Sequence, residues 1–111
     1  MSLISDILYI RSNLKLKKAV DLIQYDNEEA LRILESIGAS TNPPYGKEIT
    51  SAAVFFYKGV VLHALHRDAE AKYNLRLVQL IPTWYIVFGK STIEDIKNSA
   101  KEYLEEMFED M

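Results

Sequence analysis

Hydrophobic residues recur at every third or fourth position along most of the chain, which is the period of an α-helix. The first such run occupies the N-terminal part, with Ser12-Asn13 as an expected break or bend, and its apolar positions are Leu3, Ile4, Ile7, Leu8, Leu14, Leu16, Val20 and Ile23. A second helix is expected over the segment "EEALRILESIG". Asn27 is suited to cap its start, and Gly38 to supply the left-handed residue that ends it.

The segment from about Ile49 to His66 is apolar on nearly every side and follows a loop that the prolines of "ASTNPPYGKE" predict. A helix of this kind has to be covered by neighbours on several faces, so we expect it at the centre of the domain. The next helix is expected to run from Asp68, as its N-cap, to about Leu80. Its predicted buried residues are Ala71, Leu75, Val78 and Tyr73.

The last helix is predicted in the segment "STIEDIKNSAKEYLEEMFEDM". Ser91 lies three residues before Glu94, which is the spacing of a capping box. The apolar residues of this helix form one stripe, namely Ile93, Ile96, Ala100, Tyr103, Leu104, Met107 and Phe108. The preceding "TWYIVFG" has strand-forming residues but no second strand to pair with, so we expect a short helix or a packed turn. The whole pattern predicts an all-α fold of about five helices.

Length and composition describe a single domain that spans residues 1–111. The net charge is −3, whereas a protein that binds nucleic acid usually needs a concentrated basic surface. The short basic cluster of Arg11, Lys15, Lys17 and Lys18 is therefore interpreted as a solvated helix face. We expect no nucleic-acid partner.

The composition also indicates the cellular compartment of the protein and whether the chain spans a membrane. The chain has no cysteine, which excludes disulfides, a thiol nucleophile and a zinc site built on cysteine. Its most apolar segment, "AAVFFYKGVVLHAL", is interrupted by Lys58 and His63 and is shorter than the about 20 residues of a membrane span. The N-terminus "MSLISDILYI" carries Asp6 and no basic leader, unlike a secretory signal. We expect a cytoplasmic protein that does not associate with membranes.

The two histidines, His63 and His66, are three residues apart and are closely followed by Asp68 and Glu70. Side chains at this spacing share a helix face, but Zn²⁺ needs at least three protein ligands. The carboxylates follow too closely beyond the helix end to reach the same ion, and no HExxH motif or cysteine completes the set. We therefore predict no metal site and no cofactor, with His63 half-exposed and His66 at the end of its helix.

Catalytic motifs are absent from the sequence, which contains no GxSxG, GxGxxG or GxxxxGK[ST] segment. We therefore expect that the chain is not an enzyme. The segment Gly89-Lys90-Ser91 precedes the last helix, and a helix N-terminus beside a lysine can hold an anion. The alternative hypothesis is thus a small helical enzyme or a ligand- or anion-binding protein that uses His63, His66 and this helix N-terminus.

Two segments of the chain are similar to each other. "NEEALRILESI" (residues 27–37) aligns with "DAEAKYNLRLV" (residues 68–78), and each follows an apolar helix. Such a repeat predicts stacked helical hairpins. Gly59 supports this arrangement, because glycine in a helix interior costs about 1 kcal/mol relative to alanine and is expected where another helix approaches closely. We expect it to face Ala71.

The second of these units resembles the tetratricopeptide repeat family. Phe55 stands at the position of the family's bulky anchor, Gly59 at its small residue of the first helix, and Leu62 follows. The turn "HRD", the "AEA" opening of the second helix and Pro82 near the closing proline complete the likeness, while the first unit keeps "NEEAL". The resemblance covers about residues 12–83. It implies two antiparallel helical hairpins, closed here by the C-terminal helix as a cap.

The resemblance also implies a function, since family members hold a peptide or partner helix on a concave surface. Carried onto this chain, that surface consists of Lys15, Ala19, Leu22, Ile23, Ala53, Phe56, Val60, His63 and Ala64. It is mostly apolar and keeps only Lys15 of the family's carboxylate clamp, so chaperone-tail binding is not expected. An amphipathic helix, from a partner or from the chain's own last helix, fits it better. We therefore expect a protein-interaction or scaffold module.

Self-association is expected as well. Two repeats are fewer than the about three that a helical solenoid normally needs to bury its faces, so apolar surface should remain. The candidate dimer interface consists of Leu3, Ile4, Ile7, Leu8, Trp84 and Tyr85. A two-fold homodimer is the commonest closed arrangement. In the alternative, the run that includes Trp84 folds under the last helix and completes the core.

Overall fold

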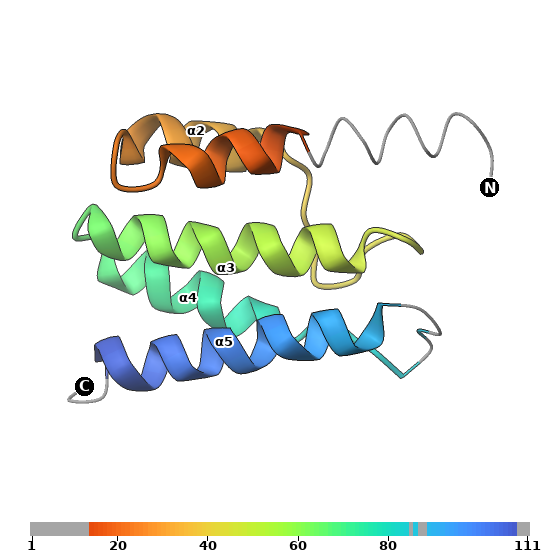
Figure 1. Cartoon of the computed structure of the whole chain (residues 1–111). Helices are drawn as coiled ribbons and strands as arrows, with labels where there is room; N and C mark the ends of the chain where they lie inside the picture. Colours follow the sequence, from red (N-terminus) through yellow and green to blue (C-terminus); the bar gives the residue numbers. More distant parts are fainter. Residues whose placement is uncertain (1–13, 85, 87–88, 109–111) are drawn as a thin grey trace.

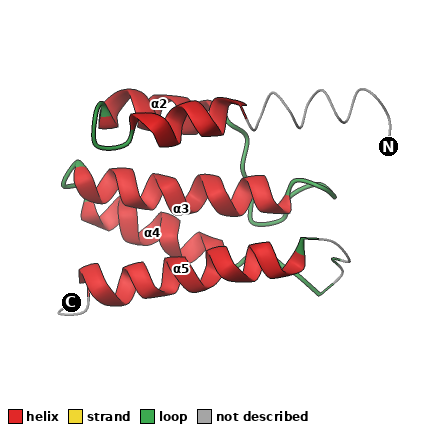
Figure 2. Cartoon of the chain, in the orientation of Figure 1, coloured by secondary structure: helices red, strands yellow, loops and turns green. Residues whose placement is uncertain are grey.

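The computed structural model describes residues 14–84, 86 and 89–108. They form a helix over residues 14–22 and four further helices, α2 (Asn27–Ser36), α3 (Glu48–Ala64), α4 (Asp68–Gln79) and α5 (Lys90–Phe108). Turns and loops connect them, and these residues contain no strand (Figure 2). The predicted all-α fold of about five helices is confirmed.

Consecutive helices pack as hairpins (Figure 1). The helix of residues 14–22, α3 and α5 lie side by side at the front of the view, and α2 and α4 lie behind them. α3 packs against α2, α4 and α5, and α4 also packs against α5. The helix with the most apolar composition is therefore covered on the most sides, as its sequence predicted.

The core contains side chains from α2 to α5, and its largest fully buried apolar residues are Leu34, Val54, Val61, Leu75, Val78, Ile81 and Ile93. The predicted burial of Ala71, Leu75 and Val78 is confirmed. Tyr73 is 64% exposed, so its predicted burial was wrong. In a helix, a residue two positions from both Ala71 and Leu75 lies on the opposite face.

Gly59 lies at the closest approach of α3 and α4. A Cβ atom added to Gly59 would lie 2.4 Å from Cγ and 2.6 Å from Cδ2 of Leu75. The predicted contact with the following helix is confirmed, but the residue that faces the glycine is Leu75 and not Ala71. These two residues are one helical turn apart, so they share a face of α4 and the sequence alone could not separate them.

Both ends of α2 differ from the prediction by about one residue. Asp26, not Asn27, is the N-cap, and its carboxylate accepts a hydrogen bond from the backbone N–H of Glu29 at 3.1 Å. The Asn27 side chain instead accepts from the backbone N–H of Gln24. At the other end, Ile37 is extended, and Gly38 does not have a positive φ. Gly38 therefore does not end the helix by a left-handed turn.

Two predicted N-caps were also wrong. α4 has Arg67 at its N-cap position, and Asp68 is the first helical residue, where its carboxylate is hydrogen-bonded to His63. α5 begins at Lys90, with the Gly89 carbonyl accepting from the N–H of Ile93. Ser91 therefore lies inside the helix and forms no capping box. Adjacent polar residues compete for such positions, and local sequence does not choose between them.

His66 ends the helical segment of α3 in an unusual conformation for a residue with a side chain, with φ of 62°. The N–H of Arg67 donates to the Leu62 carbonyl at 2.8 Å, and the N–H of His66 donates to the His63 carbonyl at 3.0 Å. These two bonds define a Schellman motif, in which the left-handed residue is usually glycine. The predicted place of His66 at the helix end is confirmed.

The strain at His66 leads to a stability prediction. We expect His66→Gly to raise the free energy of unfolding by about 0.5–1 kcal/mol, because glycine avoids the cost of about 1–2 kcal/mol for a left-handed side-chain residue but loses more chain entropy. Urea denaturation monitored by circular dichroism measures the change. His66→Ala keeps the Cβ atom and should give no gain, so equal stability of the two variants would contradict this explanation.

α5 closes the C-terminal side of the stack. Side-chain hydrogen bonds join it to the end of α4: Lys97 Nζ donates to the Ile81 carbonyl at 2.6 Å, and Gln79 donates to the Lys97 carbonyl at 2.7 Å. From the predicted stripe, Ile93, Ala100 and Phe108 are buried, while Met107 is 46% exposed. The opposite face is polar and exposed and includes Glu94, Asp95, Asn98, Glu102 and Glu105. A polar outer face is what a terminal cap requires.

The connection between α4 and α5 matches the predicted packed turn where it is described. The N–H of Ile86 donates to the Thr83 carbonyl at 3.1 Å, and Ile86 packs against the core. Trp84 is 84% exposed, so the alternative in which this residue completes the core does not hold.

Candidate functional site

The residues predicted to bind a partner fall into two groups by burial. Ala19 has no exposed surface and Ala53 only 6%, so both belong to the core and not to an accessible surface. Lys15 and Ala64 are exposed, and the others are half-buried: Leu22, Ile23, Phe56, Val60 and His63. The accessible part of the predicted surface therefore lies along α3, with contributions from both ends of the helix of residues 14–22.

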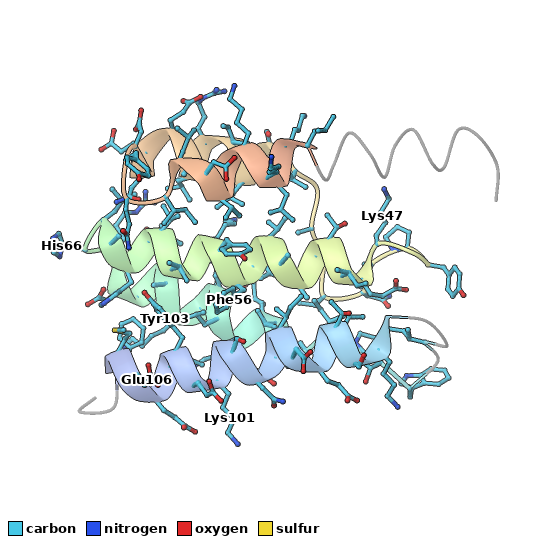
Figure 3. The ribbon with its side chains drawn as sticks, viewed as in Figure 1. Lys47, Phe56, His66, Lys101, Tyr103 and Glu106 are labelled. Atoms are coloured by element: carbon cyan, nitrogen blue, oxygen red, sulfur yellow. The ribbon has the colours of Figure 1, made fainter. Side chains whose placement is uncertain are left out.

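Part of this surface is already in contact with α5. The Phe56 and Tyr103 rings (Figure 3) meet edge to face with centroids 6.3 Å apart. The centroid of the Tyr103 ring also lies 6.0 Å from that of the His63 ring. His63 packs edge to face on Phe108 at 4.9 Å. The chain's own last helix thus covers the side of Phe56 and His63 that faces it. Sequence analysis assigned Tyr103 and Phe108 to the core stripe of α5 but missed that they adjoin the candidate surface.

His63 is the polar end of this aromatic group. Its Nδ1 atom lies 2.9 Å from a carboxylate oxygen of Asp68, and the two side chains are 31% and 46% exposed. This contact joins the end of α3 to the start of α4. Because Asp68 holds Nδ1, only Nε2 of the ring is left for another partner.

Tyr103 places a phenol in this aromatic group, in contact with the Phe56 and His63 rings. Burial raises the pKa of Tyr103, and the negative charge of Asp68 raises it further. Both causes disfavour the phenolate in the folded protein. The folded protein is therefore not destabilised by Tyr103 below the ordinary tyrosine pKa of about 10, where the phenol is neutral in both states. Stability is lost as the pH rises from there through the raised pKa of Tyr103 in the folded protein.

We therefore expect the wild-type protein to lose stability between pH 9 and pH 11.5 more steeply than Tyr103→Phe. The variant has no phenol to ionise, so one of the groups that favour the unfolded chain at high pH is removed. Urea midpoints at several alkaline pH values measure the difference. Tyr25→Phe is the control for loss of a hydroxyl, since Tyr25 is 88% exposed. Parallel curves for wild type and Tyr103→Phe would contradict the prediction.

The residues of the alternative hypothesis do not form one site. His63 and His66 lie at the end of α3, whereas a Cβ atom added to Gly89 would lie 2.7 Å from the side chain of Ile49, at the start of α3. Ile49 and His63 are fourteen helical residues apart, a separation of about 21 Å. His63 and His66 also cannot share an ion readily, because His66 lies beyond the helix in the left-handed conformation. Among the described residues no group of three metal-binding side chains is close enough to hold a metal ion.

Two open hollows occur elsewhere on the described surface. One of about 460 Å³ lies between α2 and the turn that joins α3 to α4 and includes Arg32 and Arg67. These arginines already form ion pairs with Glu29 and Glu70. The other hollow, of about 420 Å³, lies beside the loop between α2 and α3. Neither hollow includes a histidine or a residue of the predicted partner surface.

The predicted dimer interface is described only in part. Trp84 is exposed, as a contact residue must be before association. The other members lie outside the described residues, namely Leu3, Ile4, Ile7, Leu8 and Tyr85. The prediction for them stays untested.

Comparison with protein-family models, curated proteins and solved structures finds no match for this chain. The likeness to tetratricopeptide repeats therefore stays a prediction from the sequence. Over the described part of the chain, none of the helices combines the length and the apolar character that a membrane span requires.

Proposed function

We propose that this chain is a protein-interaction module that binds a peptide or a partner helix along one face of α3. We call this face, which carries Phe56, Val60, His63 and Ala64, the front of α3. The observation that carries the proposal is the row of Phe56, Val60, His63 and Ala64, which are half-buried or exposed beside Tyr103 of α5. Apolar side chains that remain accessible along one helix favour a partner that covers them. The stacking of consecutive hairpins supports a scaffold of the tetratricopeptide type.

The chemistry of the row favours an amphipathic helix as the ligand. Phe56, Val60 and Ala64 follow one another at four-residue steps on α3, and the Phe56 ring contacts Tyr103. Val60 and Ala64 are small, so a bulky apolar side chain of the ligand can lie over them. An amphipathic helix supplies such anchors at three- and four-residue spacing. Lys15, which is exposed, provides a positive charge for an acidic residue of the ligand.

A peptide-display selection tests the proposal. Peptides selected on the wild-type domain should bind with micromolar affinity, and Ala64→Glu should weaken this binding at least tenfold, about 1.4 kcal/mol. Ala64 is exposed, so the variant should still fold. Ser99→Glu, at an exposed position of α5, is the matched control and should bind like wild type. Selected peptides whose binding is insensitive to Ala64→Glu would contradict the assignment of the surface.

A thermal-shift screen distinguishes this function from the alternative of an enzyme or an anion-binding protein. Divalent metals, phosphate and nucleotides are the probes, and a ligand at 100 times its dissociation constant stabilises a protein by about 2.7 kcal/mol. We expect no shift with any of them. A shift that is lost in His63→Gln or in Lys90→Gln would support the alternative. A cytoplasmic location is part of the proposal, and the chain has no cysteine that would require an oxidising compartment.

A further inference from the structure

The outer face of α4 carries an apolar stripe that no described residue covers. Tyr73 and Leu80 are each 64% exposed, and Leu77 between them is half-buried. Leu80 caps the helix with φ of −83° and ψ of −9°, so it continues the helical geometry. Spacings of four and three residues place the three side chains on one face of the helix. We call Tyr73, Leu77 and Leu80 the α4 stripe.

The internal repeat supplies a control for this stripe within the same molecule. α2 and α4 are equivalent helices, and the alignment of residues 27–37 with 68–78 pairs Arg32 with Tyr73 and Ser36 with Leu77. Arg32 and Ser36 are exposed and polar, as expected for a helix face in water. The equivalent positions of α4 are apolar although they are accessible. The outer face of α4 therefore differs from a solvated face in composition and not in geometry, which points to an interface.

We propose that the α4 stripe binds the α4 stripe of a second copy of this chain, in a two-fold symmetric, antiparallel pair of helices. A two-fold interface requires that the surface match itself when reversed. With the axis next to Leu77, Tyr73 of each copy faces Leu80 of the other, and the two Leu77 side chains meet near the axis. Every position of the stripe thus meets an apolar position of the second copy.

The charges next to the stripe are compatible with this pairing. Arg76 is the charged residue of α4 closest to the axis and is exposed. In the antiparallel pair it lies within reach of the Tyr73 ring of the second copy, where a cation–π contact stabilises it. Because Arg76 is close to the axis, it also lies near Arg76 of the second copy, and salt screens the repulsion between these two exposed charges. Glu70 is paired with Arg67, and the Gln79 side chain is bonded to α5. The polar groups beside the stripe therefore keep their own partners.

The size of the stripe sets the expected strength. An aromatic side chain carries about 150–250 Å² of surface. Tyr73 and Leu80 are each 64% exposed, and with the exposed Ala69 and Arg76 beside them they offer roughly 500 Å² per copy. The pair then buries roughly 1,000 Å², which is at the lower limit for a specific interface. We therefore expect a dimer with a dissociation constant of tens of micromolar. α4 lies behind α3 in Figure 1, so dimerisation leaves the front of α3 accessible.

Analytical ultracentrifugation from about 1 to 500 μM, a range that brackets this affinity, tests the proposal with charge variants. We expect Tyr73→Glu alone and Leu80→Lys alone to weaken dimerisation at least tenfold. A mixture of the two variants should dimerise again, because the new carboxylate of one copy then faces the new ammonium group of the other. Tyr45→Glu is the control, since Tyr45 is exposed but lies in the loop between α2 and α3. It should dimerise like wild type.

A cross-linking experiment gives an independent result, because the natural chain has no cysteine. Leu77→Cys should form a disulfide-linked dimer under mild oxidation, as the two residues meet near the axis. Ser36→Cys, at the equivalent position of α2, should stay monomeric under the same conditions. A wild-type protein that is monomeric up to 500 μM would overturn the proposal. A dimer that Tyr73→Glu and Leu80→Lys leave intact would overturn it equally, by placing the interface elsewhere.

Discussion

Leu75→Ala should lower the free energy of unfolding by about 3 kcal/mol, within the range of about 2–5 kcal/mol for removing a large aliphatic side chain from a core. Leu75 has no exposed surface and packs on the backbone of α3 at Gly59. Its loss leaves a cavity between α3 and α4. Both helices also pack against α5, so they cannot move together to fill the cavity without displacing α5. Thermal unfolding should show a fall of roughly 12 °C.

Leu14→Ala is the matched control for this substitution. Leu14 is 63% exposed on the helix of residues 14–22, so the same chemical change should alter the stability by less than about 0.5 kcal/mol. If both variants unfolded at the same urea concentration, Leu75 would not be the packed centre of the α3–α4 hairpin.

Gly59→Ala should destabilise the protein although alanine is the better helix former. The new methyl group would lie 2.4 Å from Cγ of Leu75, which has no exposed surface and packs within the core. Overpacking costs about 1–3 kcal/mol, and the gain of about 1 kcal/mol in helix propensity offsets only part of it. We expect a net loss of up to about 2 kcal/mol, and a larger loss for Gly59→Leu.

Gly38→Ala separates this steric effect from a general effect of removing glycine. Nothing lies within 4 Å of a Cβ atom at Gly38, and its φ is not positive, so this variant should be neutral or gain up to about 1 kcal/mol. Gly59→Ala combined with Leu75→Ala should be more stable than Leu75→Ala alone, because the methyl group then occupies the cavity. Strict additivity of the two free-energy changes would show that the two residues do not touch.

The candidate site could be predicted from the sequence only in outline. Phe56, Val60, His63 and Ala64 share one face of a helix because their spacing requires it. The burial of Ala19 depends on the packing of other helices around it, and the sequence of its own helix does not reveal this. The contact of Tyr103 with Phe56 likewise joins residues far apart in the chain. Periodicity identifies a face but not what lies opposite.

The two histidines also show which features can be predicted from the sequence and which depend on the fold. The sequence predicts no third ligand for His63 and His66, because the chain has no other histidine and no cysteine, and Asp68 and Glu70 follow too closely. The pairing of His63 with Asp68 could not be predicted, since Asp68 was equally suited to cap α4. The choice depends on the Schellman turn at His66, which places the start of α4 beside the last turn of α3.

The sequence by itself was therefore enough to predict the helices, their buried faces and a close approach of another helix at Gly59. Helical periodicity and the low helix propensity of glycine depend only on residues close together in the chain. The packing of the folded chain decided the rest: that Leu75 meets Gly59, that α5 covers one side of α3, and that Tyr73 and Leu80 remain exposed. Each of these depends on which surfaces of distant segments meet. An apolar residue is suited to the core and to an interface alike, and only its surroundings in space distinguish the two.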